Sequence, residues 1–286
     1  MARYARPRTL DEALAVRAGG RWRVIAGATD FYPSQGAAPL DDDVLDVSAI
    51  ASMRGIASDQ EGWRIGATTT WSDIVRADLP PAFASLQLAA REVGSVQVQN
   101  RATIAGNLCN ASPAADGVPP LMVLDAEVEL ASVRGVRRQP LSSFILGNRK
   151  TALGADELLT AICVPKGAGA GRSAFLKLGA RRYLVISIAM VAARISVAGD
   201  GRVAEAAVAV GSCSPVAMRL TELERDLAGH AADPSLANIV HARHCMALSP
   251  IDDVRATSEY RREAVRELVS RALALATGAE PGEAAA

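Results

Sequence analysis

The sequence predicts a protein of two domains, each of which mixes helices and strands. Three observations support this prediction. With 286 residues, of which 50% are hydrophobic, the chain is long enough for one large core or two modest ones. Helical and strand patterns alternate up to about residue 168 and change after a glycine-rich stretch. The longest apolar run, 183–193, is about half of a membrane span, which favours a soluble chain.

The first domain is expected at 1–168 and begins with a helix at 9–18. Thr9 is followed three residues later by Glu12, which is the capping-box pattern, and two glycines end the helix. The other expected elements are strands at 22–27, 43–50 and from 62, helices from about Thr70 and at 80–94, a strand in the second half of 120–133 and a strand at 156–165.

The stretch KGAGAGR (166–172) is expected to be a flexible boundary. The second domain, 169–280, should contain a small sheet and helices. Its apolar segment 183–193 fits either a helix or a buried strand, and a hairpin should turn at GDG. An amphipathic C-terminal helix has Ser258 as its expected N-cap, and residues 281–286 are expected to be disordered.

Charge and cysteine usage exclude several classes of protein. The 31 basic residues balance the 31 acidic ones, so nothing indicates binding to nucleic acid or to an anionic membrane. Four widely spaced cysteines indicate reduced thiols in a cytoplasmic protein. His241 and His244 lack a third ligand, so no metal site is expected, and no nucleophile–base pair is evident. Any redox chemistry must therefore be carried by a bound cofactor.

Two segments of small residues and turn formers are candidates for a binding site. IAGATDF (25–31) places a glycine directly after a strand, and TIAGN (103–107) is a second such turn. Turns of this kind point backbone N–H groups in one direction and suit phosphate oxygens, although a strand–glycine turn is also a common structural feature. Asp116 has the side-chain type that binds a ribose hydroxyl, or that caps a helix.

The chain resembles the FAD-binding medium subunit of the molybdenum hydroxylases, the family of xanthine dehydrogenase and carbon monoxide dehydrogenase. The resemblance covers nearly the whole chain in order: AGATD, TIAGNLCNASPAAD, DELLTAICVP, AFLKLGARR and SPIDDVRATSEYRREAVRELVSRAL. It implies an α+β fold, in which a PCMH-type FAD-binding domain of two α/β subdomains precedes a C-terminal domain of a small antiparallel sheet and a helix bundle.

The resemblance also implies which residues contact the cofactor. The first turn would hold the pyrophosphate, the second would be another contact loop, and Asp116 would bind the adenosine portion. Family members usually have glycine where this chain has Ala28 and Ala105, and alanine costs about 1 kcal/mol more than glycine wherever φ is positive. The implied contacts are Val24, Ile25, Ala26, Gly27, Ala28, Thr29, Asp30, Phe31, Thr103, Ala105, Gly106, Asn107, Asp116, Leu159, Lys177 and Tyr183.

The implied function is electron transfer within a heteromeric enzyme. A large molybdopterin subunit would hydroxylate the substrate, and two [2Fe–2S] clusters of a small subunit would pass electrons to a noncovalent FAD in this chain. An external acceptor, which would be NAD⁺, O₂ or a quinone, would then take them. A dimer of heterotrimers is the expected assembly. Two alternatives stay open: a stand-alone FAD-dependent oxidase or dehydrogenase of a related fold, and a non-catalytic nucleotide-binding scaffold.

Overall fold

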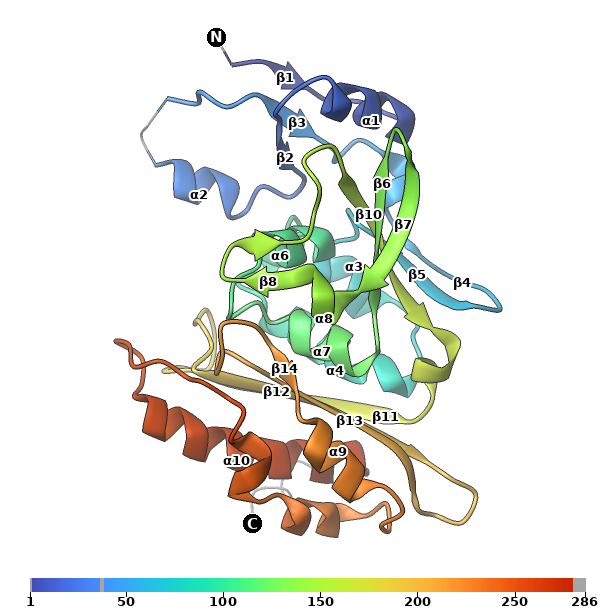
Figure 1. Ribbon diagram of the computed structural model, residues 1–286, viewed down its shortest axis with the longest axis vertical. Helices are drawn as coiled ribbons and strands as arrows, with labels where there is room; N and C mark the ends of the chain where they lie inside the picture. The colour runs from blue at the N-terminus through green and yellow to red at the C-terminus, as the bar shows by residue number, and fades with distance from the viewer. Residues whose placement is uncertain (1, 37–38, 280–286) are drawn as a thin grey trace.

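The computed structural model describes residues 2–36 and 39–279, so the tail at 281–286 that is expected to be disordered lies outside the described part. Three sheets follow one another along the long axis of the molecule (Figure 1). The N-terminal sheet lies at one end, a larger sheet with several helices occupies the middle, and a third sheet lies near the other end, beside the C-terminal helix. This α+β arrangement is the predicted fold class.

The N-terminal sheet is parallel, with its third strand paired between the other two. The Thr9 hydroxyl accepts the Glu12 amide, and the Glu12 carboxylate accepts the Thr9 amide, which confirms the predicted capping box. The elements of this part are β1 (Tyr4–Ala5), α1 (Leu10–Ala18), β2 (Arg23–Ile25), α2 (Phe31–Gln35) and β3 (Val44–Asp46).

The middle sheet has five antiparallel strands in the order β4-β5-β10-β6-β7. Its central strand, β10, is buried on both faces up to its last residue, Pro165. The strands are β4 (Ile56–Ser58), β5 (Gly62–Gly66), β6 (Glu127–Ser132), β7 (Gly135–Pro140) and β10 (Leu158–Pro165). The helices are α3 (Trp71–Arg76), α4 (Ala84–Glu92), α5 (Val96–Gln99), α6 (Ile104–Asn110), α7 (Val118–Val123) and α8 (Leu141–Phe144), and a small hairpin is formed by β8 (Ile145–Gly147) and β9 (Lys150–Thr151).

The third sheet is antiparallel and is covered on both faces (Figure 1). Met190 and Ala192 belong to the core of the middle part, whereas Val191 and Ala193 belong to a second core under the C-terminal helix. This alternation joins the two parts of the chain through one sheet. Its elements are β11 (Arg172–Leu178), β12 (Ala189–Val197), β13 (Val203–Gly211), β14 (Met218–Arg219), α9 (Thr221–Leu227) and α10 (Ser258–Ala276).

Several local predictions are wrong. Residues 103–107 are the cap and first turn of helix α6 rather than an open turn. The stretch 166–172 is packed rather than a flexible linker, because Ala168 is buried and Gly169 lies so close to the Trp63 ring that a Cβ would overlap it. The N-cap of α10 is Thr257, one residue before the expected Ser258. Within the described ranges, no helix is long and apolar enough to cross a membrane.

Candidate functional site

The turn between β2 and α2 is shaped by a close approach of two backbone segments. Gly27 lies against the chain that leads into α6, where a Cβ would overlap the carbonyl group of Arg101. The next residue, Ala28, has a φ of +56°, in the region that favours glycine. Position 27 therefore requires a glycine because the two backbone segments pack so closely. This close packing places the turn directly beside α6.

The same turn offers a row of unused donors. In the part of the chain that the structure describes, the amides of Gly27, Ala28, Thr29 and Asp30 donate no hydrogen bond. Four consecutive unpaired N–H groups in a concave turn form an arrangement that attracts anions.

Helix α6 contributes side chains to the site, while its first amides are already used. The Thr103 hydroxyl accepts the Gly106 amide at 3.1 Å, so this hydroxyl is engaged as the helix cap. The Ile104 and Ala105 amides donate to the carbonyl oxygens of Thr69 and Ala67 at 3.0 and 3.2 Å. The second small-residue segment therefore does not present free amides, contrary to the sequence-based expectation.

One side chain of α6 has an unmet hydrogen-bonding requirement. The Oδ1 atom of Asn107 is buried and has no partner among the described residues. A buried acceptor without a donor is costly, and native structures rarely retain one without a ligand or water to satisfy it.

The first turn and α6 together line a cavity of about 500 Å³. This cavity collects eleven of the sixteen residues expected to contact a cofactor: Val24, Ile25, Ala26, Gly27, Ala28, Thr29, Asp30, Phe31, Thr103, Gly106 and Asn107. Ala105 and Leu159 line a smaller cavity of about 100 Å³, which shares six residues with the larger one: Val24, Ile25, Ala26, Thr103, Gly106 and Cys109. Residues outside the expected set of contacts also line the larger cavity: Arg23, Ser34, Trp71, Val93, Val98, Ala102, Cys109, Asn110 and Arg149.

Asp116 and Lys177 lie elsewhere, as a buried ion pair. Their carboxylate and ammonium groups are 2.6 Å apart, and the Ser187 hydroxyl donates to Asp116 at 2.8 Å. Burial raises the pKa of the Asp116 carboxyl, while Lys177 and Ser187 act in the opposite direction. Lys177 lines another cavity, of about 600 Å³, which is also lined by Glu92, the residue before Val93 of the first cavity.

Tyr183 lies on the segment between β11 and β12 and is 58% exposed. Its hydroxyl accepts the Arg182 Nε at 3.0 Å, and the Arg182 guanidinium lies 5.4 Å from the ring centroid. Arg181 and Arg182 line the 600 Å³ cavity, together with Arg91. The structure thus gathers three arginines around this cavity, with Tyr183 next to them.

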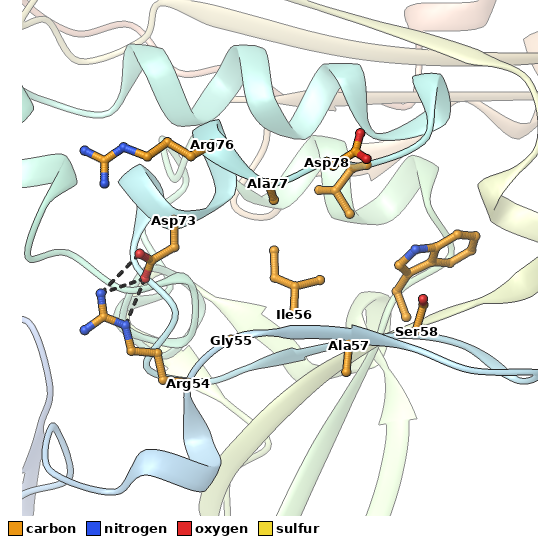
Figure 2. Close-up of a pocket in the computed structure, with 11 residues that line it drawn as sticks. Arg54, Gly55, Ile56, Ala57, Ser58, Asp73, Arg76, Ala77 and Asp78 are labelled. Atoms are coloured by element: carbon orange, nitrogen blue, oxygen red, sulfur yellow. Dashed lines mark hydrogen bonds and ion pairs between the residues drawn. The ribbon is translucent and has the colours of Figure 1, made fainter.

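A further hollow of about 460 Å³ lies between β4 and α3 and is shown in Figure 2. Arg54 and Asp73 point toward each other there and form an ion pair at 2.9 Å (Figure 2). The Ile56 side chain occupies the middle of the view. None of the residues expected to contact a cofactor lines this hollow, whereas eleven of them line the cavity beside α6.

Residues 1–167 match the family described as FAD binding domain in molybdopterin dehydrogenase. The chain belongs to this family. Residues 174–276 of this FAD-binding protein match a second family, described as CO dehydrogenase flavoprotein C-terminal domain. Together with the relatives, the two matches identify the chain as an FAD subunit of an oxidoreductase of the xanthine dehydrogenase and CO dehydrogenase type.

Named relatives of this FAD-binding subunit match over almost their whole length. The glyceraldehyde dehydrogenase medium chain of Sulfolobus acidocaldarius is 30% identical, over 94% of this chain and 96% of the relative. The putative xanthine dehydrogenase FAD-binding subunit XdhB of Escherichia coli is 27% identical, over 99% and 98%. The solved carbon monoxide dehydrogenase from Hydrogenophaga pseudoflava superimposes with a TM-score of 0.84 at 26% identity, covering 96% of each chain.

The residues around the 500 Å³ cavity fit FAD. Its volume lies within the range of roughly 300–1,000 Å³ that is usual for cofactor sites. The four unpaired amides provide donors for a pyrophosphate, and Asn107 adds a polar side chain to the lining. Gly106 lines the cavity without a side chain that would fill it.

Proposed function

We propose that the 500 Å³ cavity binds one FAD noncovalently, with its pyrophosphate at the amides of Gly27 to Asp30. The observation that carries this proposal is the row of unpaired amides in a turn that lines this cavity. Bound there, FAD supplies the capacity to accept electrons and pass them on. The chain's own residues bind and orient it, and the small side chains of the turn leave room for its phosphates.

The remaining contacts implied by the resemblance are proposed in two groups. Ala105 and Leu159 contact the cofactor through the adjoining small cavity. Lys177 contacts it from the 600 Å³ cavity, held in position by the buried carboxylate of Asp116. This proposal is supported by the lining of the two larger cavities, since Glu92 lines one and the next residue, Val93, lines the other. Tyr183 is proposed to border the flavin end.

We further propose that the chain is the middle component of a cytoplasmic complex. A small subunit with two [2Fe–2S] clusters delivers electrons, a large molybdopterin subunit oxidises the substrate, and NAD⁺, O₂ or a quinone is the final acceptor. The names of the relatives, which include medium chains and FAD-binding subunits, support this role. The expected assembly is a dimer of heterotrimers, and the two family matches support domains at 1–168 and 169–280.

Purification of the chain from cells that also express the proposed [2Fe–2S] and molybdopterin subunits tests both the FAD site and the complex. The complex should contain one FAD per copy of this chain, and acid precipitation should release all of the flavin into the supernatant. Flavin that stays with the pellet, or FMN in place of FAD, would contradict the cofactor assignment. Elution of the chain on its own, with FAD and with substrate oxidation activity, would instead support a stand-alone oxidase.

A further inference from the structure

Arg149 lies at the tip of the β8–β9 hairpin and has an unusual backbone conformation. Its φ is +58°, in the left-handed region that arginine rarely occupies and that glycine occupies freely. A strained residue persists where the surrounding contacts fix it and where its side chain serves a purpose there.

The backbone of Arg149 is fixed to the end of helix α6. Its amide donates to the carbonyl oxygen of Ala111 at 2.9 Å, and Ala111 ends α6 in the left-handed conformation, with a φ of +46°. The hairpin tip is thereby attached to the helix that lines the cofactor cavity.

The side chain of Arg149 joins the two segments that form the cavity. Its Nη1 donates to Asp30 Oδ2 at 2.8 Å, in the turn after β2, and to Asn110 Oδ1, on α6. All three residues line the cavity. The Arg149 and Asp30 side chains are 56% and 57% exposed, and an ion pair between two such side chains contributes little to folding. The tight hairpin turn itself favours a positive φ, and the ion pair adds little stability of its own.

One edge of the guanidinium remains available for a ligand. Within the described residues, only Nη1 of the Arg149 side chain has hydrogen-bond partners, while Nε and Nη2 have none. Nε and Nη2 form the planar fork that binds two oxygens of a phosphate at once. Asp30 carries a negative charge beside the unpaired amides, so a bound phosphate also needs a cation that neutralises this carboxylate.

We propose that Arg149 is an anion-binding residue of the cofactor site and holds a phosphate of the dinucleotide through Nε and Nη2. Asp30 and Asn110 orient the guanidinium through Nη1, and the hairpin tip closes one side of the cavity. This inference rests on the proposed binding of FAD and adds a residue that the resemblance does not supply.

Binding of FAD and of ADP to the full-length apoprotein tests the inference. Arg149→Gln should weaken the binding of both ligands by roughly ten- to a hundredfold, the usual effect of losing a charged hydrogen bond. Arg149→Gly should weaken both to a similar extent while melting at or above the wild-type temperature, because it relieves the positive φ. Lys150→Gln is the matched control, since it removes the neighbouring charge of the same hairpin at an exposed residue outside the set that lines the cavity.

The outcomes separate this inference from the function on which it rests. Wild-type affinity in both Arg149 variants, or an equal loss in Lys150→Gln, would overturn the inference and leave FAD binding standing. Weaker FAD binding with unchanged ADP binding would also overturn it, because the contact would then be with the flavin side of the ligand. A wild-type chain that binds neither ligand would overturn the proposed function and this inference together.

Discussion

Ala28 and Ala105 occupy two positions where related proteins usually have glycine, and their backbones differ. Ala28 has a φ of +56°, whereas Ala105 lies in the first turn of helix α6 and is 8% exposed. The side chain of Ala28 is therefore a source of strain, while that of Ala105 supports the helix and its packing.

Substitution of these alanines by glycine should have effects of opposite sign. Ala28→Gly should raise the free energy of unfolding by about 1 kcal/mol, because it removes the left-handed alanine. Ala105→Gly should lower it by about 0.5–1 kcal/mol, because glycine weakens a helix. Urea unfolding of the two apoproteins measures both values. A loss of stability in Ala28→Gly would contradict the assigned strain.

Substitution of Asn107 should change stability and cofactor binding in opposite directions. Its buried Oδ1 has no partner among the described residues, so Asn107→Leu should raise the stability of the apoprotein by about 1 kcal/mol. Because Asn107 lines the cavity, the same change makes the lining less polar and should lower the FAD content of the purified chain. Asn238→Leu, at an exposed residue, is the control. FAD content equal to the wild type in Asn107→Leu would show that Asn107 does not contact the cofactor.

Tyr183 should affect the electron acceptor and leave FAD content unchanged. Its exposed ring lies beside Arg182, at the edge of a cavity lined by three arginines. An aromatic ring there limits access to the flavin, so Tyr183→Ala should change the ratio of the reoxidation rates with O₂ and with NAD⁺ by roughly two- to tenfold. Stopped-flow reoxidation of the dithionite-reduced complex measures this ratio, with Tyr183→Phe as the control that keeps the ring. Equal ratios in all three proteins would place the acceptor elsewhere.

At the scale of single elements, the sequence correctly predicts the helices and strands that are marked by a signal within a few residues. The capping box at Thr9, the helix after Thr70 and the strand that ends at Pro165 are confirmed, because a cap, a period or a proline marks each one. Helix α6 was missed because Gly106 and two asparagines have low helix propensity, and its first amides depend on carbonyl groups about 36 residues earlier in the sequence. No local signal reveals such partners.

The same distinction applies to the candidate site. The sequence predicted that the turn at 25–31 and the segment at 103–107 contact the same cofactor. In the structure, residues of both segments line one cavity. Arg149 was missed because it contacts Asp30 across a sequence separation of 119 residues, through a hairpin that packs back against the site. The burial of Asp116 against Lys177 was likewise hidden, since the two residues are 61 positions apart.

The attachment of helix α10 should depend on pH through Asp253. Burial tends to raise the pKa of this carboxyl, but hydrogen bonds from Arg255 and from the buried Arg261 outweigh it and lower the pKa from 3.8 to about 2. Arg261 in turn donates to the carbonyl oxygens of Ile188 and Ser212. A depressed pKa contributes stability that is present above the ordinary value and is lost as the pH falls toward about 2.

Asp253→Asn should therefore reduce the pH dependence of stability between about pH 4 and pH 2. Urea unfolding at several pH values measures it, and Asp200→Asn, at an exposed turn, serves as the control. A slope equal to the wild type in this interval would show that Asp253 does not link α10 to the sheet.

At the scale of the whole molecule, buried charges cross between the middle part and the third sheet. Arg194 on β12 is fully buried, and its Nε donates to the carbonyl oxygen of Val123, at the end of α7, at 2.7 Å. Its Nη2 pairs with Asp125 at 3.2 Å. Asp116, just before α7, pairs with Lys177 on β11. These links fix the third sheet against α7 and the residues on either side of it.

The Asp116–Lys177 pair should behave as a single coupled unit. Its side chains are only 10% and 7% exposed, so removal of one partner leaves a buried charge without compensation. Asp116→Ala and Lys177→Met should each lower the free energy of unfolding by about 3–5 kcal/mol, and the double variant should lose clearly less than the sum of the two. Urea unfolding of the three apoproteins measures this coupling. The exposed pair Glu267–Arg271, treated in the same way, should give a coupling of about 0.3–0.5 kcal/mol. Additive losses at Asp116 and Lys177 would show that these two side chains do not act as a coupled pair.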